Sequence, residues 1–146
     1  MAYTIVVGYD GSEMSKKALD AAVGIAKIMP DGEIMIACAQ DRPAPAVGFR
    51  GPEFGVEELW EKVVASIEKG LAEAAARVSA AGVKVATACT PDSPDVTIIK
   101  VAKDVNAALI VVGTKGAGAR PGERTALGST TTKLLHEKGD FPVLVV

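Results

Sequence analysis

Hydrophobic positions fall into two kinds of segment that alternate along the chain. Short runs rich in β-branched residues, such as Ile5–Val7 and Leu109–Val112, are apolar at consecutive positions. Longer segments between them place apolar residues at three- and four-residue spacing, which is the period of a helix packed along one side. Strands that are apolar at consecutive positions have both faces covered. The pattern therefore predicts a parallel sheet between two layers of helices.

Five strands are predicted where the short apolar runs end in turn residues. They span Thr4–Gly8, Glu33–Ala39, Val83–Thr90, Ala108–Gly113 and Pro142–Val146. The longest of the intervening helices carries an apolar stripe formed by Leu59, Val63, Ile67, Leu71, Ala74 and Val78. The fold class expected for residues 1–146 is a single-domain α/β protein: an open parallel five-stranded sheet, Rossmann-like, in the order 3-2-1-4-5, with helices on both faces.

Local signals place the helix starts and the long loops. Ser12 is a suitable N-cap for the helix that follows the first strand, and Pro94 suits the first turn of the helix after the third. The stretches Asp41–Gly55 and Thr114–Leu127 are rich in glycine and proline or alanine. Loops of this length in a compact domain are usually either functional or disordered, so both stretches are candidate parts of a site.

Composition excludes several classes of function. The 146 residues carry a net charge of −2, so the chain lacks the basic excess that gives affinity for nucleic acid. We find no secretory signal and no apolar run that could cross a membrane, and we expect a cytoplasmic protein with no membrane partner. Cys38 and Cys89 lie far apart without CxxC spacing, and we expect buried, reduced, structural thiols. A single histidine, with no cysteine close to it, argues against a zinc site.

Candidate chemistry gathers after the first and fourth strands. In an open parallel sheet, ligands bind outside the carboxyl ends of the strands, where the strand order reverses. Asp10 follows the first strand, and Gly113 and Gly116 follow the fourth. Glycines permit a positive φ and a close approach of the backbone to a ligand. The run Gly128–Thr131 begins the last helix, where unpaired N–H groups, the helix dipole and hydroxyls favour an anion, most naturally phosphate.

These segments resemble the signatures of the universal stress protein family. The resemblance covers essentially the whole chain and is carried by Ile5–Ser12, Leu109–Gly116, Leu127–Ser129 and Pro142–Val146. The ATP-binding branch of that family has the motif Gly, two residues, Gly, nine residues, then Gly and Ser or Thr. Gly113 and Gly116 fit this motif, but eleven residues separate Gly116 from Gly128, so the loop is two residues longer.

The resemblance implies a bound ATP or related adenine nucleotide, with Mg²⁺ bridged through the phosphates. It places Asp10 near the base and ribose, and the backbone at Ala39 on the adenine edge. Val112 and Gly113 would line the sugar. The residues that would hold phosphates are Gly116, Gly128, Ser129, Thr130 and Thr131. It also implies a homodimer through antiparallel pairing of the last strand, which agrees with the apolar edge that Phe141–Val146 presents.

The leading functional hypothesis is a nucleotide-responsive stress or regulatory protein rather than a dedicated enzyme. The sequence shows no Ser–His–acid set and no paired carboxylates placed by spacing. Three alternatives stay open: a slow ATPase or nucleotidyl-transfer enzyme that uses Asp41–Gly55 as a lid, a cyclic AMP-binding member, and an empty scaffold that serves oligomer contacts. Arg120 and Arg124 are either a clamp on the phosphates or solvated charges in the long loop.

Overall fold

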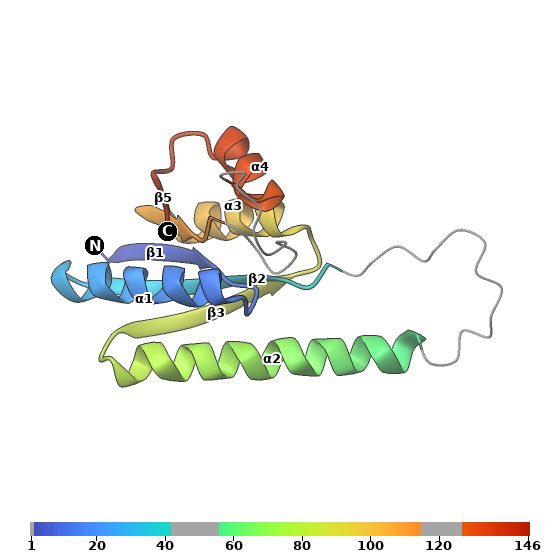
Figure 1. Ribbon diagram of the computed structural model, residues 1–146. Coiled ribbons are helices and arrows are strands. Elements are labelled where there is room, and N and C mark those ends of the chain that lie inside the picture. Colours follow the sequence, from blue (N-terminus) through green and yellow to red (C-terminus); the bar gives the residue numbers. More distant parts are fainter. Residues whose placement is uncertain (1, 42–55, 115–126) are drawn as a thin grey trace.

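The computed structural model describes residues 2–41, 56–114 and 127–146. Strands and helices alternate along this part of the chain, and Figure 1 shows three layers, with α1 and α2 on one face of the sheet and α3 and α4 on the other. In chain order the elements are β1 (Tyr3–Gly8), α1 (Glu13–Ile28), β2 (Gly32–Ala39), α2 (Val56–Ala80), β3 (Lys84–Thr90), α3 (Pro94–Val105), β4 (Leu109–Val112), α4 (Ser129–Glu137) and β5 (Val143–Val145).

The sheet has five strands in the order β3-β2-β1-β4-β5, and every neighbouring pair is parallel. β1 lies in the middle, where Ile5 is opposite Ile34 of β2 on one side and Leu109 of β4 on the other. The predicted open parallel sheet and its strand order are confirmed. All the strands therefore end at the same edge of the sheet.

Burial on both faces explains why β1 is apolar at consecutive positions. Ile5 and Val7 belong to the core beneath α1 and α2, whereas Val6 belongs to the core beneath α3 and α4. Each of the three side chains is 0% exposed. Successive side chains of a strand point to opposite faces, so a strand between two helical layers has no position for a solvated residue.

The third and fifth strands are shorter than the apolar pattern predicts. Val83 is buried, but its N–H donates to the carbonyl oxygen of Val78 at the end of α2 (3.3 Å), so β3 begins one residue later. At the other end of the sheet, the N–H of Val146 still donates to the carbonyl oxygen of Val112 (2.9 Å) beyond the last residue of β5. The core pattern is unaffected by these differences.

α2 is covered along only part of its predicted apolar stripe. Leu71 and Val78 are 5% and 0% exposed, but Leu59 and Val63 are 64% and 45% exposed. A helix of 25 residues is about 38 Å long, whereas a strand of eight residues spans only about 26 Å. Figure 1 shows the N-terminal half of α2 extending past the sheet. None of the described helices, α2 included, combines the length and the apolar character that crossing a membrane requires.

This difference in burial along α2 predicts that replacing leucine by alanine has different effects at two positions of the helix. Leu71→Ala leaves a cavity in the core and should lower the free energy of unfolding by about 2–5 kcal/mol. Leu59→Ala changes an exposed position on the same helix and should stay within about 0.5 kcal/mol of the parent. Urea denaturation followed by circular dichroism measures both. Equal losses would mean that something covers the N-terminal half of α2 in solution.

Candidate functional site

A cleft lies at the sheet edge where the strands end, between the carboxyl ends of β1 and β4. These two strands are neighbours, and β1 continues the sheet toward β2 and β3, so the cleft is at the point where strand order reverses. The helices α1, α3 and α4 all contribute residues from their first turns. The lining residues are Gly8, Tyr9, Asp10, Ser12, Ser15, Ala37, Ala39, Pro94, Ile98, Val112, Gly113, Thr130 and Thr131.

The turn after β1 orients Asp10 at the mouth of the cleft. Gly11 has a φ of +82°, a conformation that glycine adopts without strain. This turn brings the N–H of Ser12 to the carboxylate oxygen Oδ1 of Asp10 (2.9 Å). The hydroxyl of Ser12 in turn accepts from the N–H of Ser15 (3.2 Å), which confirms the predicted N-cap of α1. Asp10 is exposed, so its carboxylate is held by the turn and is accessible to solvent.

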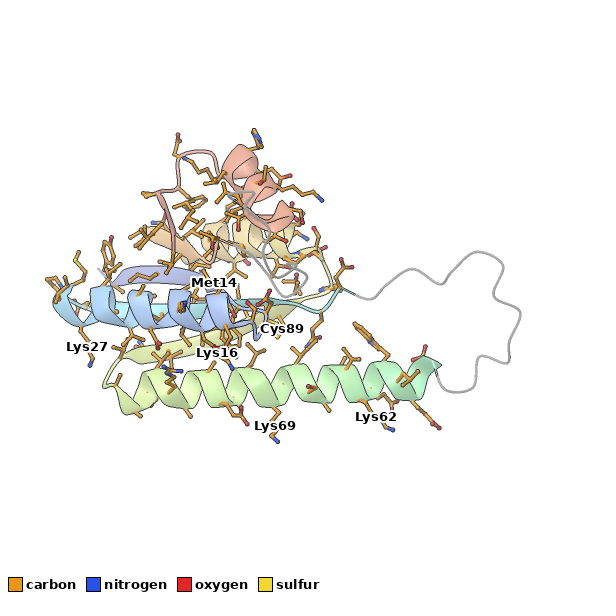
Figure 2. The ribbon with its side chains drawn as sticks, viewed as in Figure 1. Met14, Lys16, Lys27, Lys62, Lys69 and Cys89 are labelled. Atoms are coloured by element: carbon orange, nitrogen blue, oxygen red, sulfur yellow. The ribbon has the colours of Figure 1, made fainter. Side chains whose placement is uncertain are left out.

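Glycine is required at position 113, directly after β4, for a reason that the sequence does not reveal. We expected this glycine to permit a positive φ, and that expectation is wrong, because Gly113 is not among the described residues with positive φ. A Cβ atom at this position would lie 2.9 Å from the Cβ of Met14 and 3.1 Å from its carbonyl carbon. Met14, labelled in Figure 2, belongs to the first turn of α1. Glycine is therefore needed for close packing of β4 on α1.

The first turn of α4 is fixed to the end of β4 by two hydrogen bonds. Thr131 is 4% exposed, and its hydroxyl donates to the carbonyl oxygen of Gly113 (2.8 Å). The N–H of Gly128 donates to the carbonyl oxygen of Thr114 (2.7 Å). Gly128 is the N-cap of α4 and supplies no side-chain acceptor for the first-turn N–H groups. Thr130 and Thr131 place this turn against the cleft.

The charge on the cleft comes from backbone dipoles as much as from side chains. Among the described residues that line it, the titratable side chains are Asp10 and Tyr9. Burial raises the pKa of Tyr9, so its hydroxyl stays protonated at neutral pH. The N-termini of α1, α3 and α4 each carry a partial positive charge toward this end of the sheet. An anionic group is therefore favoured beside these helices and disfavoured beside Asp10.

The structure brings most of the sequence-predicted residues together. Those that line the cleft are Asp10, Ala39, Val112, Gly113, Thr130 and Thr131. Gly128 and Ser129 lie at the start of α4 but are not among the lining residues. Gly116 lies outside the described residues, as do Arg120 and Arg124.

Sequence reasoning missed the contribution of α3. Pro94 and Ile98 line the cleft, and Ala37 of β2 joins them. The helical period assigned Ile98 to the core, where it is indeed 4% exposed. Its position one turn from the helix start was the available signal, because first turns after parallel strands face the edge where the strands end.

The fold and the cleft define an open parallel α/β protein with a cleft at the switch point of its sheet, where ligands bind in proteins of this class. The sequence model of the universal stress protein family matches residues 1–146, and the chain belongs to this family. Universal stress protein YxiE of Bacillus subtilis is 30% identical, over 97% of each chain. The resemblance seen in the sequence is thus confirmed.

Solved structures show the same fold. A crystal structure of a universal stress protein in complex with cAMP is 28% identical, with a TM-score of 0.68 over 100% of this chain and 98% of the other. The universal stress protein from Archaeoglobus fulgidus in complex with dAMP is 16% identical, with a TM-score of 0.64 over 99% of this chain and 97% of the other. At 16% identity, the similarity to the Archaeoglobus fulgidus protein shows a shared fold alone.

The bond between α4 and β4 gives a testable prediction. Thr131→Val removes the hydroxyl and leaves the partly buried carbonyl of Gly113 without its donor, which should cost about 1–3 kcal/mol of stability. Thr132→Val is the matched control, because the exposed Thr132 hydroxyl donates only within its own helix, to Gly128 (2.9 Å). Thr131→Ser should retain most of the parent's stability. Chemical denaturation compares the three variants, and equal stability of the two valine variants would contradict this role of Thr131.

Proposed function

We propose that residues 1–146 act as one cytoplasmic nucleotide-binding domain with a regulatory role in a stress response. The ligand is an adenine nucleotide, with ATP the first candidate and cyclic AMP the alternative. The observation that carries the proposal is the convergence of the β1 and β4 ends with three helix N-termini on one cleft. In this proposal, the presence or absence of bound nucleotide in the cleft carries the regulatory signal, and hydrolysis of the nucleotide is not required.

The α4 side of the cleft suits the phosphates. The first-turn N–H groups of a helix and its dipole together favour an anion. Thr130 is half-buried and lines the cleft, whereas Ser129 is exposed at the start of the same turn, and we assign both hydroxyls to the phosphates. The hydroxyl hydrogen of Thr131 already bonds Gly113, so Thr131 would contribute its backbone N–H. Gly128 and the segment that contains Gly116 complete the phosphate side in this proposal.

The β1 and β2 side suits the base and the sugar. Ala37 and Ile98 give this part of the lining an apolar surface for a base, and Val112 of β4 would line the sugar. Asp10 would be repelled by a polyphosphate but accepts hydrogen bonds from ribose hydroxyls. The backbone at Ala39, the last residue of β2, lies where it can meet the adenine edge. Base, sugar and phosphate thus follow one another from β2 across β1 to α4, with Gly113 beside the sugar.

The choice of an adenine nucleotide is supported by a relative, and the regulatory role by the lining of the cleft. The universal stress protein that is 28% identical was solved in complex with cAMP. Mg²⁺ would enter with the nucleotide and be held mainly by phosphate oxygens and water. Among the described lining residues, Asp10 is the carboxylate available as a base. Because we assign it to the ribose, we propose a binding protein rather than an ATPase.

Asp10→Ala tests the ribose assignment. Loss of charge-assisted hydrogen bonds of about 1.5–3 kcal/mol should weaken nucleotide binding roughly 10- to 100-fold. Asp104→Ala is the control, because Asp104 is an exposed carboxylate near the far end of α3. Calorimetric titration with ATP, AMP and cyclic AMP measures each affinity, and phosphate release with Mg²⁺ measures turnover. If Asp10→Ala binds every nucleotide with the affinity of the parent, the ligand does not contact Asp10 and binds elsewhere.

We also propose a homodimer through β5. This strand is at the edge of the sheet, next to β4 alone, and Leu144 at its centre is 38% exposed. An apolar edge strand readily pairs with another strand. Antiparallel pairing with a second copy would continue the sheet and cover Leu144.

Leu144→Lys should shift a β5-mediated dimer toward the monomer, because two lysines would meet near the dimer axis. Sedimentation equilibrium at micromolar concentration measures the shift. Leu59→Lys is the control, since Leu59 is exposed on α2, far along the chain from β5. A parent protein that is already monomeric, or a dimer that only Leu59→Lys dissociates, would refute this interface.

A further inference from the structure

The sheet brings the chain's two cysteines side by side. Cys38 of β2 and Cys89 of β3 are direct partners in the parallel register, although 50 residues separate them in sequence. The sequence-based expectation of two buried thiols holds for Cys38, which is 5% exposed, and is wrong for Cys89, which is exposed. The pair therefore consists of one buried and one accessible thiol.

The geometry of the pair suits a covalent bond. Neighbouring strands lie about 4.7–4.9 Å apart, and the Cα atoms of a disulfide are usually about 4.4–6.8 Å apart. Register partners in a parallel pair project to the same face, here the face that α2 covers, where Cys38 packs in the core with Leu71. Figure 2 labels Cys89 near the end of β3 on this side.

The surroundings of the two thiols assign them different roles. Burial is the main cause that raises the pKa of Cys38 to about 11, and the neighbouring Cys89 and Asp10 act in the same direction. Burial also raises the pKa of Cys89, although its interaction with the neighbouring Cys38 thiol acts in the opposite direction. Cys89 is thus the more accessible nucleophile. Cys38 also borders a cavity of about 270 Å³, which is lined by Tyr9, Lys16 and Glu73 among others.

We propose that Cys38 and Cys89 are a site of reversible oxidation, where they form an intrachain disulfide beside the nucleotide cleft. A low-molecular-weight disulfide is the oxidant. The Cys89 thiolate attacks one of its sulfurs, the small disulfide bond breaks, and one small thiolate leaves. Cys38 then loses its proton to solvent and attacks the Sγ atom of Cys89, which releases the second small thiolate. Two protein thiols are oxidised, and one small disulfide is reduced to two thiols.

The position of the pair connects it to the cleft. Cys38 lies between Ala37 and Ala39, and both of these line the cleft. A disulfide would join the last residues of β2 to β3 where the backbone meets the proposed adenine edge. An effect of the disulfide on nucleotide binding rests on the proposed function, whereas formation of the disulfide does not. We expect oxidation to change nucleotide affinity by at least threefold.

Glutathione redox buffers test the bond directly. After equilibration, acid quench and alkylation, intact mass distinguishes the products. The parent should lose two hydrogens and take up no alkylating agent, and since the chain has only two cysteines the bond is then assigned. Cys38→Ser should gain one glutathione on Cys89, whereas Cys89→Ser should keep Cys38 reduced.

Three outcomes would overturn the proposal: two reduced thiols in the most oxidising buffer, two glutathione adducts, or disulfides between chains. Circular dichroism shows whether each serine variant is folded, and alanine variants replace any that is not. Titration of oxidised and reduced parent with ATP tests the link to the cleft, with the Cys38→Ser, Cys89→Ser double variant as the control that oxidation must not change. If no form binds nucleotide, the proposed function fails while the mass measurement still decides the disulfide.

Discussion

The burial of β1 between two parallel strands and two helical layers is the constraint on which the rest of the structure depends. Ile5, Val6 and Val7 are fully buried, and their backbone pairs with β2 on one side and β4 on the other. Parallel pairing requires every connection to cross back over the sheet, which the helices do. The strand ends and the helix starts are thereby gathered at one edge, and the cleft is a consequence of the same arrangement.

Close packing at that edge holds the parts of the cleft in place. Gly113 allows β4 to approach the first turn of α1 to a distance that a Cβ atom would not permit. Thr131 then joins α4 to the same residue through its hydroxyl. α1 and α4 are therefore both fixed to the end of β4. Ordering a ligand site before the ligand arrives reduces the entropy that binding must overcome.

The fold was predictable from the sequence because its signals are local. Consecutive apolar positions identify buried parallel strands, and the helical period identifies the helices, so only the exact strand ends differ. Periodicity, however, shows which side of a helix is apolar and does not show whether anything covers it. Leu59 and Leu71 are indistinguishable on the α2 stripe, yet one is exposed and the other buried.

The candidate site was predictable where a residue follows a strand and not where a contact spans the sheet. Asp10 and Gly113 were found because they follow the ends of strands. The reason for glycine at 113 was not, because it depends on Met14, which is remote in sequence. The pairing of Cys38 with Cys89 likewise requires the register of β2 against β3. Linear spacing contains no information on either contact.

The balance of charge in the cleft bears on which part of a nucleotide the described residues can recognise. A helix N-terminus is equivalent to roughly half a positive charge, and the carboxylate of Asp10 contributes a full negative one. In the proposed binding mode, the sugar lies toward Asp10 and the phosphate toward α4. The described lining residues include no basic side chain that would attract each additional phosphate. A divalent cation that arrives with a polyphosphate would supply that attraction, since it neutralises the added charge without a dedicated side-chain site.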